Sequence, residues 1–261
     1  MADTTASWED AIISEAERAQ IVQNGRLLSE VLTRYLQVIC RGAQAATEWE
    51  GFARAILDRS NYTFQTILSI ADREIDAAGL TRVLYEHAVT FAWVAIAPAR
   101  HLRMFERHSL NEAKKIVNDM KAVGAFMPNA QAHEAALASQ ERVLANVDAA
   151  PPTPERAHAA DAHWEQVLTD ATRFRRSYAS TFRFCSSFLH PTVAGVSAFV
   201  TRDPLKIGVP TIERFGGAAS DAVCILFSEL LVANRALGWP PEQEIVRAFA
   251  SGLASNEGAE Q

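Results

Sequence analysis

Apolar residues recur every three or four positions along most of this sequence, the pattern expected of helices with one buried face. The first run follows Ser7 and Asp10, whose three-residue spacing resembles a capping box at a helix start, and Ser109 with Glu112 repeats that spacing. Gly25 leaves open whether the first run forms one long helix or two. Further helices are predicted at residues 45–78, 81–97, 109–124, 128–147, 154–190, 218–237 and 241–253.

Several residues mark the expected ends and breaks of these helices. We expect an interruption near Ser60 and Asn61, and Gly79 is typical of a helix C-terminus. Pro98 closes the strongly apolar helix that precedes it. The clearest break is DAAPPTP at residues 148–154, where three prolines exclude a helix.

These elements predict an all-α protein, a multi-helix bundle with a short irregular or two-stranded insertion near residues 195–215. The insertion is expected there because VSAFV and KIGV have the character of short strands between Gly and Pro residues. The break at 148–154 is short, so we interpret it as a loop inside one domain. That domain has two packed helical halves, about 7–147 and 154–253.

Composition and charge limit the classes of function. Nearly half of the 261 residues are apolar, and the net charge of −6 argues against a nucleic-acid binder that uses its whole surface, so no DNA partner is expected. A local basic segment is either the contact for an anionic partner or a solvated helix face. This basic segment comprises Arg100, His101, Arg103, Arg107, His108, Lys114 and Lys115.

The chain is expected to be cytoplasmic. Its polar, acidic N-terminus lacks the features of a signal peptide. The most apolar stretch, residues 218–238, contains Asp221, Glu229, Asn234 and Arg235, which predicts a buried helix rather than a membrane span. The cysteines, which are widely spaced, indicate neither a disulfide framework nor a zinc site, and we expect small buried side chains. They are Cys40, Cys185 and Cys224.

Arg82 and Glu86 stand out because they lie four residues apart in a helix that is otherwise almost entirely apolar. A charged pair in such a helix should be at least partly desolvated. Two interpretations stay open: an ion pair that fixes a neighbouring helix, or a group that serves a ligand or a reaction. If the pair is buried, loss of Glu86 should cost on the order of 3–5 kcal/mol.

A second polar cluster comprises Tyr178, Arg183, Ser186, Ser187 and His190. Arg183 and His190 are seven residues apart and therefore share nearly the same helix face. A proline follows His190, so the helix should end at the histidine, where the helix dipole favours its protonation. This arrangement can bind an anion or move a proton. Alternatively, the histidine only caps the helix and the arginine faces solvent.

Together, Arg82-x-x-x-Glu86 and the segment from Tyr178 to His190 resemble a family of uncharacterised, all-helical bacterial proteins. The resemblance spans roughly residues 63–200. It implies the helical fold, and it implies no particular activity.

The Arg183-x6-His190 spacing is also similar to the R-x4-6-H motif of HEPN ribonucleases. That resemblance implies a helical, dimeric, metal-independent ribonuclease of the kind found among toxins and antiviral effectors. His190 would then be the general acid and base, and Arg183 would hold the phosphate. Phe184 and the proline after His190 depart from the family pattern and place the ribonuclease activity in doubt.

The leading hypothesis is a buried polar pocket between the 81–97 and 154–190 helices. Arg82, Glu86, Tyr178 and the two serines would bind a small ligand or RNA there, in a binding or regulatory role, in bacterial defence or stress. The alternatives are the ribonuclease, with a possible homodimer, and a purely structural scaffold. No H-E-x-x-H or phosphate-loop motif is present, so no metal site and no cofactor are expected.

Overall fold

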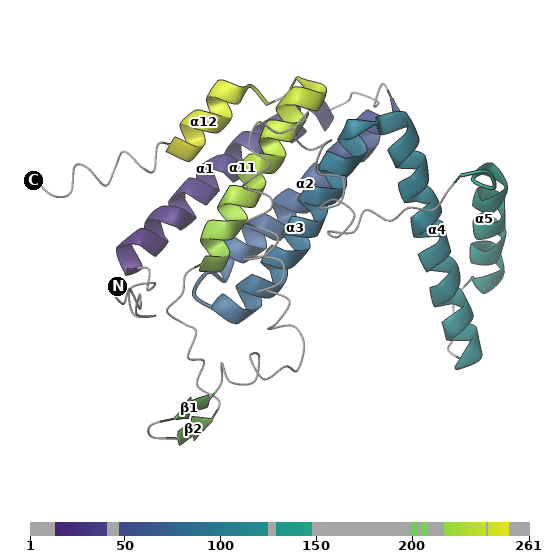
Figure 1. Ribbon diagram of the computed structural model, residues 1–261, viewed down its shortest axis with the longest axis horizontal. Helices are drawn as coiled ribbons and strands as arrows, with labels where there is room; N and C mark the ends of the chain where they lie inside the picture. The colour runs from purple at the N-terminus through teal and green to yellow at the C-terminus, as the bar shows by residue number, and fades with distance from the viewer. Residues whose placement is uncertain are drawn as a thin grey trace, which may run out of the picture.

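The computed structural model describes residues 14–40, 47–124, 129–147, 200–202, 205–207, 217–238 and 240–250. The predicted all-α fold is confirmed in these ranges, which are almost entirely helical (Figure 1). The helices are α1 (Glu15–Cys40), α2 (Glu48–Ser69), α3 (Glu74–Ile96), α4 (Pro98–Ala122), α5 (Ala130–Val143), α11 (Gly217–Leu237) and α12 (Glu242–Ala250).

Two short antiparallel strands lie within the insertion predicted near residues 195–215. They are β1 (Val200–Arg202) and β2 (Leu205–Ile207), and Val200 pairs with Ile207. The strands follow the predicted segments only in part, because β1 starts at the last residue of VSAFV and β2 starts one residue before KIGV.

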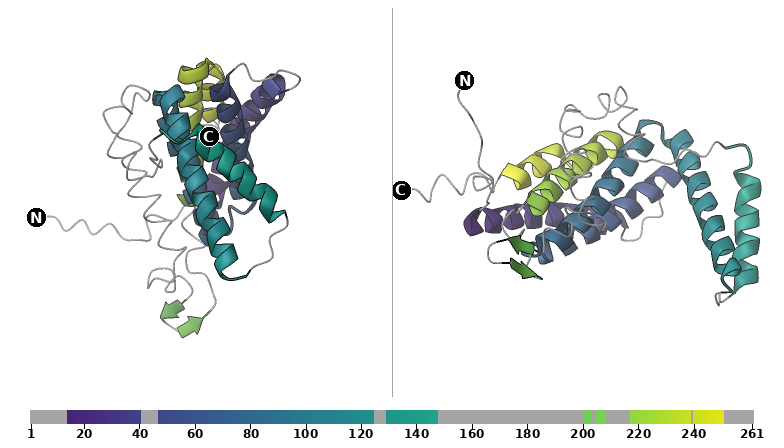
Figure 2. Two further views of the ribbon diagram at one scale, coloured as in Figure 1. Left: turned by 90° about the vertical axis from the view of Figure 1, so that its right-hand side faces the viewer. Right: turned by 60° about the horizontal axis from the view of Figure 1, so that its bottom comes forward.

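Helices α1, α2, α3 and α11 form the main bundle, and α12 packs on α1 and α11 (Figures 1 and 2). All five contribute buried side chains to one core, so the described helices near the C-terminus pack directly on those of the first half. The loop at 148–154 and the expected helix at 154–190 lie outside the described residues. The division into two helical halves stays a prediction.

Helix α11 is long and apolar enough to cross a membrane by length and composition. In the structure, 61% of its most apolar window is buried inside the protein. It packs against α1, α2 and α3 as a core helix of the bundle, in agreement with the buried helix predicted from its charged residues. Cys224 of α11 is exposed, so the expectation that it is buried is wrong: the thiol lies on the outer face of this helix.

The interruption predicted at Ser60 and Asn61 is wrong, because α2 is continuous. Both side chains are buried and hydrogen-bonded to other helices: the Ser60 hydroxyl donates to Glu229 at 2.9 Å, and the Asn61 amide donates to Thr33 at 2.9 Å. Polar residues that usually compete for the backbone are tolerated here because neighbouring helices satisfy them.

The helix stop predicted at Gly79 is also wrong, because α3 begins at Glu74 and runs through Gly79. Gly79 is buried, and two residues later the Thr81 hydroxyl donates to the carbonyl of Ala77 at 2.8 Å and to that of Ala218 at 3.1 Å. Small residues thus continue the helix where α3 meets α11. Gly79 therefore lies inside α3 rather than at a helix C-terminus.

Helix α3 ends at Ile96, just before Pro98, as predicted. The helix start predicted at Ser109 is wrong, because α4 already begins at Pro98 and is continuous through Ser109. The expected cap partner Glu112 instead forms an ion pair with Lys115 at 2.6 Å within the same helix. The capping box predicted at Ser7 and Asp10 lies outside the described residues.

Helices α4 and α5 form a hairpin that extends away from the main bundle (Figures 1 and 2). Two ion pairs hold α5 on α4, namely Lys114 with Glu141 at 2.6 Å and Lys121 with Glu134 at 2.7 Å. No residue of α5 between Ala130 and Val143 is buried.

Helix α1 is one continuous helix through Gly25. A Cβ atom placed on Gly25 would lie 2.8 Å from Leu68 Cδ2 and 2.9 Å from Phe64 Cζ of α2. The missing side chain therefore lets α1 and α2 approach closely at this point.

We predict that Gly25→Leu lowers the free energy of unfolding by roughly 1–3 kcal/mol, because the added side chain overpacks the contact with α2. Gln23→Leu, at an exposed position of the same helix, should change it by less than about 0.5 kcal/mol. Urea unfolding measures both. Equal stability of the two variants would contradict the close packing.

Glu229 is fully buried in α11, where burial raises the pKa of its carboxyl to about 8 although the hydrogen bond from Ser60 lowers it. The folded protein therefore keeps a proton that the unfolded chain loses near the ordinary pKa of 4.5. Because the folded state binds more protons in this range, the contribution of Glu229 to stability falls as pH rises from about 4.5 to about 8.

We predict that Glu229→Gln removes this loss. The unfolding free energy of the variant relative to the wild type should rise by roughly 2–4 kcal/mol between about pH 5 and pH 8. Asp58→Asn, an exposed carboxyl on α2, controls for the loss of one negative charge. Urea unfolding at several pH values tests this, and a constant difference between wild type and Glu229→Gln would contradict it.

Candidate functional site

The structure brings Arg82 and Glu86 together as an ion pair within α3, with Arg82 Nη2 at 3.3 Å from Glu86 Oε1. Their side chains are 26% and 41% exposed, whereas most of α3 is buried. The pair therefore occupies the part of α3 that the neighbouring helices leave open, and its charges are only partly desolvated.

The other predicted site residues lie outside the described residues. These are Tyr178, Arg183, Ser186, Ser187 and His190. The structure thus places Arg82 and Glu86 and does not test their proximity to the second cluster.

His87, next to Glu86, is a titratable residue that the sequence analysis missed. Burial, together with the positive charge of Arg59, lowers the pKa of its imidazole to about 4. Its Nδ1 atom is buried and has no hydrogen-bond partner among the described residues. The imidazole is therefore neutral at physiological pH, where it can accept or donate a hydrogen bond. Its position directly after Glu86 in an apolar helix was the available signal.

Glu74 is a second buried carboxyl, and it caps α11 from the start of α3. Its Oε1 atom accepts a hydrogen bond from the Ala218 N–H at 2.7 Å. Burial raises the pKa of Glu74. The backbone N–H groups of Ala218 and Gly217 and the positive charge of Arg18 act in the opposite direction and lower it. The carboxyl stabilises the helix start in the way expected of an N-terminal acid, so its role is structural.

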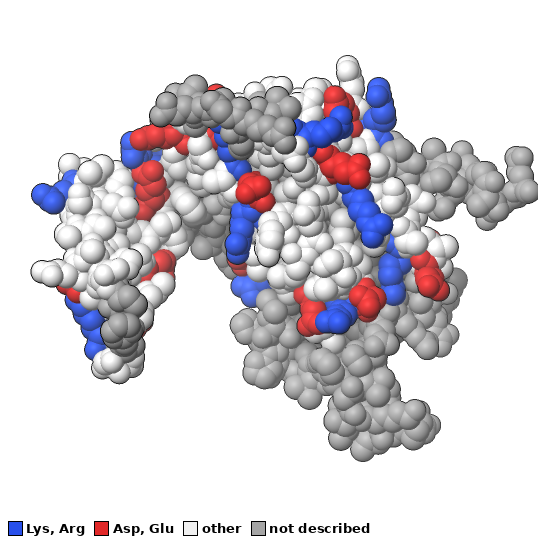
Figure 3. All heavy atoms as spheres, turned by 180° about the vertical axis from the view of Figure 1, so that it is seen from behind, with Lys and Arg blue, Asp and Glu red and all other residues white. Residues whose placement is uncertain are grey.

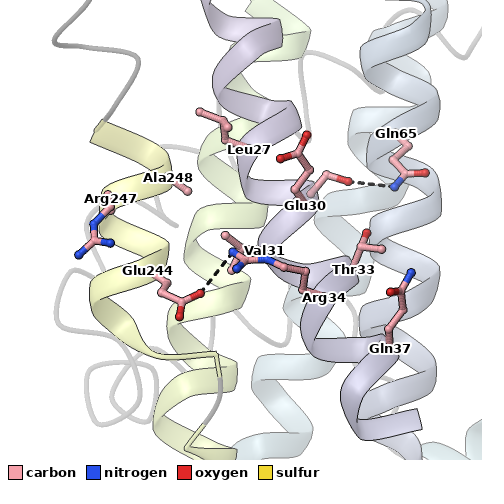
Figure 4. Close-up of a pocket in the computed structure, with 11 residues that line it drawn as sticks. Leu27, Glu30, Val31, Thr33, Arg34, Gln37, Gln65, Glu244, Arg247 and Ala248 are labelled. Carbon is pink, nitrogen blue, oxygen red and sulfur yellow. Dashed lines mark hydrogen bonds and ion pairs between the residues drawn. The ribbon is translucent and has the colours of Figure 1, made fainter. Parts of the chain in front are cut away.

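A polar groove lies along α1, between α12 on one side and α2 on the other (Figure 4). It has a volume of about 750 Å³. We call it the α1 groove; it is lined by Leu27, Ser29, Glu30, Val31, Thr33, Arg34 and Gln37 of α1, Gln65 of α2, and Glu244, Arg247 and Ala248 of α12.

A chain of side-chain hydrogen bonds forms the floor between α1 and α2. The Gln65 amide donates to the Ser29 hydroxyl at 2.9 Å, and Ser29 donates to Asn61 Oδ1 at 2.8 Å. The Asn61 amide then donates to Thr33 at 2.9 Å. Sequence reasoning missed this groove, although Ser29, Thr33 and Gln37 recur at four-residue spacing on one helix face.

The basic segment in α4 is largely balanced by acidic residues. Its ion pairs, between 2.6 and 2.9 Å long, are Arg103 with Glu48 and Glu106, Lys114 with Glu141, and Lys115 with Glu112. His101 stacks on Trp93 with ring centroids 4.2 Å apart. On the face shown in Figure 3, basic and acidic side chains lie beside one another rather than in one basic surface. These contacts favour a solvated helix face over an anion-binding surface.

The model of a family of unknown function, DUF5677, matches residues 55–206, more than half of the chain. This chain belongs to DUF5677. The family match confirms the resemblance to an uncharacterised helical family expected over roughly residues 63–200. It includes both halves of the predicted site, from Arg82 to His190, and it excludes α1, α11 and α12.

No curated protein and no solved structure matches the chain. Within the described ranges, no group of three or more His, Cys, Asp and Glu side chains is arranged to hold a metal ion.

Because the Arg82–Glu86 pair is partly exposed, we predict that Glu86→Gln lowers the free energy of unfolding by about 1 kcal/mol or less, as for a surface ion pair. Glu50→Gln is the matched control, since Glu50 pairs with Arg54 at 4.0 Å with the same four-residue spacing. Thermal or urea unfolding gives both values. A loss of 3 kcal/mol or more for Glu86→Gln alone would show that this pair is buried.

Proposed function

We propose that this protein is a cytoplasmic binding or regulatory protein that takes a phosphate-bearing ligand at the polar face of α3. The observation that carries this proposal is the Arg82–Glu86 pair, which is partly exposed on a helix that is mostly buried. A rigid, mostly buried helix fixes the direction of the guanidinium group, so little conformational entropy is lost when a ligand binds.

The chemistry of the pair favours an anionic ligand that also carries hydrogen-bond donors. A guanidinium group matches the geometry of phosphate and can bind it through two parallel hydrogen bonds. The Glu86 carboxylate accepts hydrogen bonds and suits ligand hydroxyl or amine groups. The half-buried His87 imidazole, which is neutral at physiological pH, follows Glu86 in the sequence.

A second candidate function is metal-independent cleavage of RNA by Arg183 and His190. The Arg183-x6-His190 spacing supports it, and both residues lie within the segment 55–206, as Arg82 and Glu86 do. In this reaction His190 takes the proton of a ribose 2′-hydroxyl, and the 2′-oxygen attacks phosphorus. The bond to the 5′-oxygen breaks, that oxygen receives a proton from His190, and Arg183 stabilises the phosphate charge.

The binding proposal predicts that nucleoside monophosphates or short RNA raise the melting temperature of the protein. Arg82→Gln should weaken binding at least ~10-fold, because it removes a charge-assisted hydrogen bond. Arg54→Gln, in the comparable pair on α2, should change the affinity by less than about twofold. Equal effects of the two substitutions, or no shift with any phosphate-bearing compound, would refute the α3 site.

RNA incubated with the protein and a chelator separates the two functions. The ribonuclease is supported if the protein cleaves RNA and His190→Ala abolishes the cleavage. The control His133→Ala, at an exposed histidine of α5, should leave the cleavage intact. Binding without cleavage supports the binding function alone. If neither occurs while the variants keep the wild-type melting temperature, the charged residues only stabilise a scaffold.

A further inference from the structure

The α1 groove has the size and the lining of a small-molecule site. Its volume of about 750 Å³ is within the range of ~300–1,000 Å³ typical of such sites. The consecutive helices α1 and α2 and the distant helix α12 contribute side chains to it. Its floor is fixed by the hydrogen-bonded chain of Gln65, Ser29, Asn61 and Thr33, of which Ser29 and Asn61 are buried. The polar groups are therefore held in place before a ligand enters.

The charges of the α1 groove are balanced. Two acids, Glu30 and Glu244, and two arginines, Arg34 and Arg247, line it. Arg34 Nη2 lies 3.4 Å from Glu244 Oε2, which is a long contact, and the Arg34 side chain is 65% exposed (Figure 4). A pocket with equal numbers of both charges does not attract a polyanion or a polyamine, but it complements a ligand that carries one charge of each sign.

The uncharged polar groups of the groove are chiefly side-chain amides and hydroxyls. Gln37 and Gln65 each offer the same N–H donors and C=O acceptor as a peptide group, and Thr33 adds a hydroxyl. Leu27, Val31 and Ala248 line it with apolar side chains. The groove thus combines charge of both signs, amide chemistry and an apolar surface.

We propose that the α1 groove binds a zwitterionic short peptide or amino-acid derivative with an apolar side chain. The carboxylate of the ligand pairs with Arg34 and its ammonium group pairs with Glu244, so each replaces one partner of the long Arg34–Glu244 contact. The Tyr35 hydroxyl, which donates to Glu244 Oε1 at 3.3 Å, keeps that carboxylate in position. The peptide groups of the ligand hydrogen-bond to Gln37 and Gln65.

A second hollow of about 610 Å³ adjoins the groove and gives room for a longer ligand. Thr33 and Gln37 line both, and small residues of α2, Gly51 and Ala55, open the second hollow beside α1. Its further charges are again of both signs, Arg54 and Asp58. A longer peptide can therefore extend from the groove into the second hollow, where the charged side chains are again one arginine and one acid.

This site is independent of the α3 face. Helices α1 and α12 lie outside residues 55–206, so the family match does not include most of the groove. Failure of phosphate binding at Arg82 would leave the α1 groove proposal intact, and the reverse also holds.

The test uses the full-length protein and a set of tripeptides with an apolar first residue and free termini. The same peptides with acetylated and amidated ends are the chemical control, because they keep the size and lose both charges. We expect the free peptides to raise the melting temperature, and calorimetry should show binding that blocking the ends weakens at least ~10-fold.

Arg34→Gln should weaken binding of the free peptides at least ~10-fold. Arg26→Gln, an exposed arginine of α1 that does not line the groove, is the matched control and should change affinity by less than about twofold. Both variants should melt like the wild type without peptide. Equal binding of blocked and free peptides, or equal effects of the two substitutions, would overturn the proposal. The proposal would also be overturned if a nucleoside monophosphate or spermidine stabilised the protein and no peptide did. It would equally be overturned if no peptide bound at millimolar concentration.

Discussion

Close packing between α3 and α11 determines how the rest of the bundle is arranged. Both helices have small buried residues near their N-terminal ends, namely Ala77, Ala78, Gly79 and Thr81 on α3 and Ala218, Ala219 and Ala222 on α11. The backbones are near enough for the Thr81 hydroxyl to reach the carbonyl of Ala218 at 3.1 Å. With this face and the face against α2 buried, the strip of α3 with Arg82 and Glu86 is left at the surface.

The same packing buries two carboxyls, which the structure accommodates in different ways. Glu74 lies at the start of α11, where backbone N–H groups and the helix dipole stabilise a negative charge. Glu229 lies in the middle of α11 with one hydrogen bond, from Ser60, so the carboxyl keeps its proton until the pH reaches about 8. A protonated Glu229 is a small polar group inside the core, and burying it costs far less than burying an ion.

The sequence predicts the helices and the Arg82–Glu86 pair because both follow from spacing within one segment. It also predicts helix breaks at Gly79 and near Ser60 and Asn61 that the structure does not have. The reason is that the sequence alone shows only the local propensity of a glycine or a serine. In the folded chain, contacts with α11 and α1 decide their roles. The α1 groove could not be predicted for the same reason: its wall on α12 comes from residues about 200 positions away from those on α1 and α2.

The two proposed sites are connected through α2. On this helix, the positive charge of Arg59 lowers the pKa of His87 on α3, whereas Asn61 and Gln65 form hydrogen bonds with residues of α1. Energetic coupling between sites requires an element with two discrete arrangements. Helix α2 is continuous and contributes to a single core, and Ser60 is hydrogen-bonded to the buried Glu229. A helix held in this way transmits little binding energy from one site to the other. Ligands at the α3 face and in the α1 groove should therefore bind independently.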